Sequence, residues 1–365
     1  MSKHKDHFHG SDLEQIERLY NIKKSEIVSF SANVNPLGIS YQLRQTLAEQ
    51  LDAITHYPDR DYKALRDCIA TYVNTKTENV IVGNGSTELI SLFIRAKQPK
   101  KALILGPTYS EYEREVSLGG GVTKYYQLNS EDDFALDIKD FCKALKDEVD
   151  LLVLCNPNNP TSIALSTKAL RIILDTCKQH NIFVMIDETY VEFTENVADI
   201  TAIPLTNDYH NLIILRGTSK FFASPGLRLG YAITGNADLA NAIDALKNPW
   251  SINSLAEIAG RLMLTDHEYI DKTRQLISSE RTRLVNELST WDNIRVYPPQ
   301  ANFVLMQILK KDVTAEAVFE HCIRKGLMIR NCSSFPFLDN SYVRFCIMNP
   351  EQNDRLLEAF REILC

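Results

Sequence analysis

Short and nearly continuous apolar runs recur through the middle of the chain, between residues 78 and 234. The stretches between these runs, such as 87–98 and 167–180, carry apolar residues at helical spacing. Apolar runs without alternation are typical of strands that are buried on both faces of a mostly parallel sheet. The pattern therefore predicts an α/β fold, with helices covering a mostly parallel, seven-stranded sheet. The predicted strands are 79–82, 102–105, 123–128, 151–155, 182–187, 212–216 and 228–234.

The pattern changes after Pro249. A long helical stretch at 254–290 leads into the apolar run 294–308, then into a helix around 315–326 and a final strand and helix. This order predicts a smaller α+β unit with its own sheet. We predict an N-terminal arm that packs on the small domain, then a large domain, then the small C-terminal domain. Their predicted bounds are 1–40, 41–250 and 251–365.

The bulk composition argues against several classes of protein. The formal net charge of −7 gives no electrostatic reason to expect nucleic acid as a partner. No apolar run approaches the ~20 residues that a membrane span needs, so no membrane partner is expected. The eight cysteines form no CxxC pair or cluster typical of a metal site. Scattered cysteines are typical of reduced thiols, and we expect a cytoplasmic enzyme without a metal.

Polar turns follow four of the predicted strands. They read GNGSTE, NPNNPTS, DETYVEF and GTSK, after the first, fourth, fifth and sixth strands. Open α/β sheets bind ligands outside the carboxyl ends of their strands, so four such turns predict one ligand site.

The glycine-rich turn GNGSTE has two readings. Its backbone N–H groups, at the start of a helix, suit a phosphate, but it is equally typical of a helix capped by Ser86 or Thr87. Glu88 stands where a dinucleotide fingerprint has its third glycine, which disfavours a nicotinamide-dependent dehydrogenase.

Two charged residues lie at the ends of apolar strands. Burial of the Asp187 carboxylate is costly unless the carboxylate has a partner. The partner is expected to be a helix N-terminus, the cation of a salt bridge, or the cationic ring nitrogen of pyridoxal phosphate. Lys220 is either a solvated surface lysine or, beside Phe221 and Phe222, a desolvated amine with a lowered pKa. Together they favour a pyridoxal-phosphate-dependent enzyme that acts on a small amine or amino acid.

Motifs along essentially the whole chain then suggest a family. The chain resembles the fold-type I pyridoxal-phosphate enzymes of the class I/II aminotransferase group. Within it, the chain resembles the histidinol-phosphate aminotransferase branch and, most closely, the threonine-phosphate decarboxylases of cobalamin biosynthesis. The resemblance implies a homodimer whose subunits have a large cofactor-binding domain and a smaller C-terminal domain. Besides the four turns, the matching segments are 9–10, 30–38, 57–59, 219–230 and 329–345.

The resemblance also implies roles for single residues. Lys220 is expected to form the Schiff base and to move protons, and Asp187 to keep the pyridine nitrogen protonated. Tyr190 is the third residue expected to act in catalysis, because it bonds the phenolic oxygen of the ring with Asn159. Tyr109 is expected to stack on the ring.

The remaining expected roles are in binding. The cofactor phosphate is expected to contact Gly85, Ser86, Thr87, Thr218, Arg228 and, from the other subunit, Tyr57. The substrate is expected to contact His9, Asn33, Asn159, Arg330 and Arg344.

Two positions depart from the family pattern. Gly217 replaces the usual serine or threonine three residues before the lysine, whose hydroxyl contacts the cofactor phosphate. Thr218 and Ser219 are the candidates that compensate for it. Ser162 replaces the glycine that usually follows the NPNNPT run, which changes the turn beyond Asn159.

Three functional hypotheses follow. The first is decarboxylation of an O-phosphorylated amino acid, such as threonine phosphate, through a Lys220 Schiff base. The second is aminotransfer of the histidinol-phosphate type, with 2-oxoglutarate or glutamate as partner. A non-catalytic binding protein that kept the fold is the third, and the joint presence of Lys220, Asp187, Tyr190, Asn159 and Arg228 argues against it.

Overall fold

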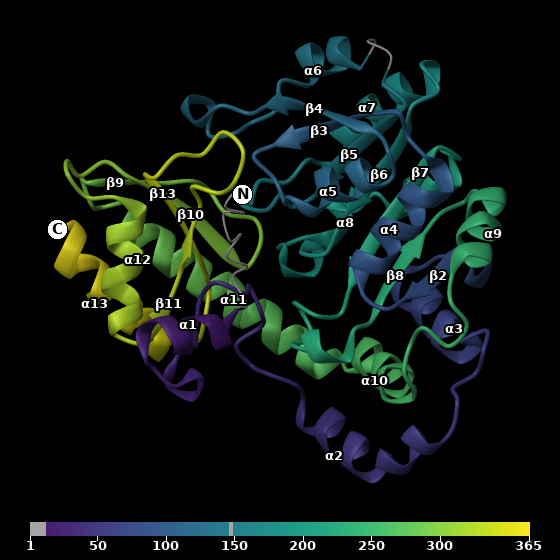
Figure 1. Cartoon of the computed structure of the whole chain (residues 1–365), viewed down its shortest axis with the longest axis horizontal. Coiled ribbons are helices and arrows are strands. Elements are labelled where there is room, and N and C mark those ends of the chain that lie inside the picture. Colours follow the sequence, from purple (N-terminus) through teal and green to yellow (C-terminus); the bar gives the residue numbers. More distant parts are fainter. Residues whose placement is uncertain (1–11, 146–148) are drawn as a thin grey trace, which may run out of the picture.

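A seven-stranded sheet forms the centre of the computed structural model, which describes residues 12–145 and 149–365 (Figure 1). The strand order is β2-β8-β7-β6-β5-β3-β4, and four of the six pairings are parallel. The predicted α/β fold with a mostly parallel, seven-stranded sheet is therefore confirmed. The strands are β2 (Val80–Gly83), β3 (Lys101–Gly106), β4 (Val122–Gln127), β5 (Leu151–Cys155), β6 (Phe183–Asp187), β7 (Leu212–Gly217) and β8 (Gly230–Ile233).

Helices cover both faces of this sheet because its strands are apolar on both sides. In β5, Leu151 and Val153 pack on one face, while Leu152 and Leu154 pack on the other. The first face is covered by α4 (Ser86–Lys97), α5 (Glu111–Leu118) and α9 (Ala237–Leu246). The second face is covered by α3 (Lys63–Val73), α6 (Ile138–Ala144) and α7 (Thr167–Gln179).

The C-terminal part builds a second, antiparallel sheet in the order β12-β13-β10-β9. Its strands are β9 (Ile294–Val296), β10 (Phe303–Ile308), β12 (Arg330–Asn331) and β13 (Tyr342–Cys346). Its helices are α11 (His267–Leu288), α12 (Ala315–Arg324) and α13 (Pro350–Leu364). The helical stretch predicted at 254–290 is two helices, since α10 (Ser254–Thr265) ends before Asp266, whose side chain caps α11.

The N-terminal segment lies against this C-terminal part, as Figure 1 shows for α1 (Leu13–Tyr20) beside α12. Tyr20 packs edge-on against Phe319 of α12. The short strand β1 (Val28–Ser29) pairs with β11 (Leu327–Met328). Among the residues that the structure describes, the α-helices not yet named are α2 (Tyr41–Glu49) and α8 (Val197–Ile200). The predicted domain bounds stay a prediction.

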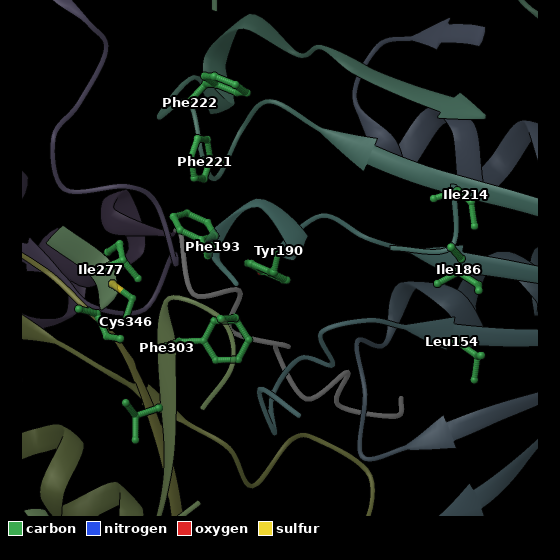
Figure 2. Packing of buried hydrophobic residues seen from close by; sticks show 14 of the residues in the cluster. Leu154, Ile186, Tyr190, Phe193, Ile214, Phe221, Phe222, Ile277, Phe303 and Cys346 are labelled. Carbon is green, nitrogen blue, oxygen red and sulfur yellow. The ribbon is translucent and has the colours of Figure 1, made fainter. Parts of the chain in front are cut away.

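The two sheets share one apolar core. Figure 2 shows the Tyr190 ring, just after β6, facing Phe303 of β10, with a centroid separation of 4.9 Å. Phe193 and Phe221 extend this contact, so aromatic rings fix the C-terminal sheet against the carboxyl edge of the large one. Among the residues that the structure describes, no helix has the length and apolar character required to cross a membrane.

Candidate active site

A cavity of about 360 Å³ lies at the carboxyl edge of the large sheet, between that edge and the C-terminal sheet. The strands β5, β6 and β7 run in parallel and end side by side there, because Cys155 is in register with Asp187, and Asp187 with Leu215. The turns that follow these strands therefore meet, as the sequence predicts. The cavity is lined by ten of the predicted site residues: Ser86, Thr87, Tyr109, Asn159, Asp187, Tyr190, Lys220, Arg228, Arg330 and Arg344.

Asp187 ends β6 as a buried carboxylate, and its hydrogen bonds come from neutral groups. Its Oδ1 accepts hydrogen bonds from the backbone N–H and the hydroxyl of Thr189, and its Oδ2 accepts one from the Tyr112 hydroxyl at 2.7 Å. Burial raises the pKa of Asp187, and these hydrogen bonds oppose the shift. Within residues 12–145 and 149–365, the carboxylate has no ion pair.

Lys220 follows β7 and places a half-buried amine in the cavity. Its Nζ donates a hydrogen bond to the Ala32 carbonyl at 2.7 Å, and its own carbonyl accepts from the Asn35 N–H at 3.0 Å. Burial, together with the positive charges of Arg344 and Arg228, lowers the pKa of Lys220 to about 8. Near pH 8, a large share of the protein molecules therefore carries Lys220 in its neutral, nucleophilic form.

The turn between β2 and α4 faces the same cavity and suits an anion. Gly85 has φ +82°, and a Cβ there would collide with the guanidinium of Arg228, so glycine lets that cation lie against the backbone. The helix begins at Ser86, and its first N–H groups carry partial positive charge. Glu88 accepts a hydrogen bond from the Asn84 N–H at 2.6 Å, so this carboxylate closes the turn.

Three aromatic or amide side chains complete the side of the cavity nearest the large sheet. Burial raises the pKa of Tyr190 to about 12, so its hydroxyl stays protonated, 3.4 Å from Nδ2 of Asn33. Tyr109 meets Tyr112 edge-on, with ring centroids 5.6 Å apart. The amide oxygen of Asn159 accepts a hydrogen bond from Arg344. We call Asp187, Tyr190 and Lys220 the sheet wall.

The opposite side carries two guanidinium groups, Arg330 and Arg344, which we call the arginine wall. They are register partners on β12 and β13, so both side chains reach the cavity from one face. Arg344 donates to the Ser31 carbonyl at 2.6 Å, and Arg330 donates to the Ser334 hydroxyl at 2.9 Å. Burial and the charge of Arg344 lower the pKa of Arg330 to about 10. The two cations therefore favour an anionic ligand between them.

Other predicted site residues lie outside this lining. Tyr57 is 80% exposed and packs against Trp250, with ring centroids 4.8 Å apart. Gly85 and Asn33 lie directly behind the lining, beside Arg228 and Tyr190. The hydroxyl of Thr218 donates to the Leu229 carbonyl at 3.2 Å. His9 lies outside the described residues.

The two departures from the family pattern have different structural consequences. At Gly217 a Cβ would meet only ordinary contacts, 3.6 Å from Ser219 and 3.7 Å from Ser86, so the missing hydroxyl leaves free space. Ser219, and not Thr218, lines the cavity beside that space. Ser162 adopts φ +62°, and its hydroxyl accepts N–H bonds from Gln300 and Ala301. It thereby ties the Asn159 turn to the C-terminal part.

Sequence reasoning missed several residues of the cavity. The main ones are Tyr112 and Thr189, whose hydroxyls bond to Asp187, and Phe335, which lies 5.5 Å from the Arg330 guanidinium. One signal was present: Tyr112 lies only three residues after Tyr109, and the two rings meet edge-on although Tyr109 precedes α5. Thr189 lies two residues after Asp187, a spacing typical of a hydroxyl that bonds a nearby carboxylate.

This fold and site define the chain as an α/β enzyme with a half-buried lysine at a sheet edge. The family model "Aminotransferase class I and II" matches residues 25–360, and the chain belongs to that family. The threonine-phosphate decarboxylase of Salmonella typhimurium is 32% identical, over 98% of this chain and 96% of its own. The family and its relatives make this protein a pyridoxal-phosphate-dependent enzyme of the decarboxylase and aminotransferase kind.

Two solved structures are similar over most of the chain. The histidinol-phosphate aminotransferase from Clostridium acetobutylicum has a TM-score of 0.85 and 33% identity, over 92% of this chain and 98% of its own. That from Sinorhizobium meliloti, in complex with pyridoxal-5′-phosphate, has a TM-score of 0.85 and 20% identity, over 96% and 94%. The second likeness concerns the fold alone.

The residues of the cavity fit pyridoxal phosphate. Asp187 is a buried carboxylate whose hydrogen bonds come from neutral donors, which suits a protonated ring nitrogen. Lys220 supplies an amine with a lowered pKa, as a Schiff base requires. The start of α4, with Arg228 beside Gly85, offers N–H donors and a cation to a phosphate.

Proposed function

We propose that this enzyme decarboxylates an O-phosphorylated amino acid, with threonine phosphate as the first candidate. The arginine wall is the observation that carries the proposal. Two guanidinium groups on neighbouring strands suit a ligand with two anionic groups, and such an amino acid carries a phosphate and a carboxylate. The 32% identity to the Salmonella typhimurium decarboxylase supports the same substrate class.

The bound cofactor supplies an electron sink for the bond that breaks at the substrate α-carbon. In our proposal Asp187 holds the ring nitrogen in its protonated form, and Tyr190 and Asn159 bond the phenolic oxygen. Ser86, Thr87 and Arg228 bind the cofactor phosphate, with Gly85, while Tyr109 covers the ring. These residues fix the ring plane and exclude water from it.

Lys220 and the arginine wall act on the substrate side. The Lys220 amine would hold the cofactor in the absence of substrate, and it would donate the proton that replaces the carboxylate on the substrate α-carbon. Arg344 and Arg330 hold the carboxylate and the phosphate, and Asn33 supports the pocket from behind Tyr190. The orientation of the carboxylate relative to the ring decides that the C–C bond breaks, and not the C–H bond.

The test is carbon dioxide release from threonine phosphate by the cofactor-loaded enzyme, with no keto acid present. We expect one carbon dioxide per substrate, together with aminopropanol phosphate. Serine phosphate tests the same class without the methyl group. No release from either substrate would rule out the decarboxylase proposal while leaving the Lys220 chemistry open.

Aminotransfer with histidinol phosphate and 2-oxoglutarate or glutamate is the second candidate. Its support is the similarity to the Clostridium acetobutylicum structure, at 33% identity. Histidinol phosphate carries a phosphate but no carboxylate, so one arginine would then serve the keto acid. Conversion of the bound cofactor to its amine form by histidinol phosphate supports this candidate, and an unchanged absorbance spectrum excludes it.

We also propose a homodimer in which Tyr57 reaches the phosphate site of the other subunit. The exposed pair of Tyr57 and Trp250 supports this, because large exposed aromatic groups are enriched at protein interfaces. Analytical ultracentrifugation is expected to show a dimer. The Tyr57→Phe variant is expected to bind the cofactor more weakly and to remain a dimer. A monomer at working concentration contradicts this part.

A further inference from the structure

Tyr112 contacts the proposed cofactor site through Asp187, and none of the roles above includes it. It lies in the first turn of α5 and is 1% exposed. Its hydroxyl donates to Oδ2 of Asp187 at 2.7 Å, and the residue also borders the cavity. The phenol therefore connects a helix on one face of the large sheet to the carboxylate at the end of β6.

The other acceptor sites of Asp187 are largely occupied. An ionised carboxylate has about four acceptor sites, two on each oxygen. Oδ1 accepts from the Thr189 N–H at 2.9 Å and from the Thr189 hydroxyl at 2.5 Å, so both of its sites are used. Oδ2 accepts from Tyr112 and has one site left. A ring N–H therefore finds its acceptor on the oxygen that Tyr112 holds.

We propose that Tyr112 is a positioning residue, which orients Oδ2 of Asp187 toward the cofactor ring nitrogen and keeps the carboxylate ionised. The inference rests on the proposed role of Asp187. A neutral donor suits this task better than a cation does. A lysine or arginine would neutralise the carboxylate and compete with the ring nitrogen, whereas a hydroxyl stabilises the charge and leaves it available.

The protonation state of Tyr112 fits this role. Burial and the neighbouring charge of Asp187 raise the pKa of the phenol well above its ordinary value, so the hydroxyl remains a donor at any working pH. Thr189 adds two further donors from the same chain segment as Asp187, and the placement of these donors depends only on the local turn geometry. Tyr112 alone among these donors comes from another element, and it fixes Oδ2 relative to the helix layer.

The experiment measures the dissociation constants of pyridoxal phosphate and of its deaza analogue, in which carbon replaces the ring nitrogen, with cofactor-free enzyme. For Tyr112→Phe we expect pyridoxal phosphate to bind about tenfold more weakly and the analogue to bind unchanged, because only the first has the N–H that Oδ2 accepts. The acid limb of pyridoxal phosphate binding is also expected to move to higher pH, since Asp187 loses a donor to its charged form.

Tyr125→Phe is the matched control. Tyr125 also donates its hydroxyl to a carboxylate of α5, that of Glu113 at 3.0 Å, but does not border the cavity. It is expected to change neither dissociation constant. Tyr112→4-aminophenylalanine keeps the ring with a weaker donor and is expected to show an intermediate preference. This graded variant tests the inference even if the phenylalanine variant does not fold, because a wild-type preference would then overturn it.

The outcomes separate the inference from the proposal beneath it. An equal loss for both ligands in Tyr112→Phe means a packing role and overturns the inference, as does no loss for either. Asp187→Asn tests the underlying proposal on its own, because it is expected to abolish the preference for pyridoxal phosphate over the analogue. If Asp187→Asn keeps that preference, the proposed role of Asp187 is wrong whatever Tyr112 does.

Discussion

The two walls of the cavity obtain their chemistry in opposite ways. The sheet wall takes Asp187 from the end of β6, and Tyr190 and Lys220 from the turns after β6 and β7. Hydrogen bonds to neutral groups hold Asp187 and Lys220. The arginine wall takes two cations from a small antiparallel sheet, and each cation opposes the charge of the other. In the proposed function the sheet wall therefore serves the cofactor, and the arginine wall serves a substrate that supplies negative charge.

The comparison also shows that the walls are coupled. Arg344 is a cause of the lowered pKa of Lys220, and it bonds Asn159, which comes from the large sheet. An anion bound at the arginine wall would offset that charge and raise the pKa of Lys220 toward its ordinary value. An anionic substrate bound as proposed on one wall would thus change the proton affinity of the amine on the other.

Loss of the sheet-wall amine is expected to have the largest effect. Lys220→Ala removes both the attachment point and the proton donor, and we expect activity to fall by about 10,000-fold or more. Visible absorbance of the purified protein and steady-state turnover measure this. A variant that keeps a tenth of the activity would show that another group supplies the amine.

Loss of an arginine-wall cation is expected to affect the substrate and spare the cofactor. Arg344→Gln removes the positive charge that is proposed to bind the substrate carboxylate. We expect kcat/KM to fall roughly 30-fold or more, which corresponds to a loss of about 2 kcal/mol. The cofactor dissociation constant is the control and is expected to stay near the wild-type value. A larger loss in cofactor binding than in kcat/KM contradicts the division into two walls.

The pH dependence of cofactor attachment tests the coupling between the walls. Attachment requires the neutral Lys220 amine, so its rate is expected to rise with pH and reach half its maximum near pH 8. In Arg344→Gln one positive charge is gone, the ammonium is less disfavoured, and the midpoint is expected to move to higher pH. Stopped-flow absorbance on cofactor-free enzyme measures both profiles. If the pH midpoint is the same in Arg344→Gln as in the wild type, the coupling between the two walls is contradicted.

The smallest expected effect is a gain at Gly217. A serine side chain fits there, because its Cβ would lie 3.6 Å from Ser219 and 3.7 Å from Ser86. Its hydroxyl adds a donor beside the start of α4, and we expect pyridoxal phosphate to bind about two- to tenfold more tightly. Gly217→Ala, which adds the Cβ alone, is the control. Equal binding by both variants means that the hydroxyl does not reach the phosphate.

The sequence predicts the sheet wall better than it predicts the arginine wall. Asp187 and Lys220 stand out because each follows a strongly apolar segment. The carboxyl ends of parallel strands meet at one edge of the sheet, so the hydrophobic pattern and the place of each residue along its strand predict that the two lie close together. Arg330 and Arg344 resemble ordinary surface arginines, and only the family motifs made them candidates. Their approach depends on how the small sheet docks through Phe303 and Tyr190, which no local pattern encodes.

The remaining residues depend on exact turn and helix geometry. The choice between Thr218 and Ser219 follows from the turn after β7, which directs the Thr218 hydroxyl to Leu229. Tyr112 acquires its contact because the packing of α5 brings the first turn of this helix beside the end of β6. Propensity and periodicity predict that both elements exist, but they do not give the positions of side chains across them.

The central claim is that Lys220 forms the covalent link to the cofactor. Borohydride reduction of the cofactor-loaded enzyme fixes that link, and mass spectrometry of the resulting peptides locates it. The account predicts a phosphopyridoxyl group on Lys220 in the peptide that follows β7, and none in Lys220→Ala. A modified lysine elsewhere in the chain, with Lys220 unlabelled, would contradict it.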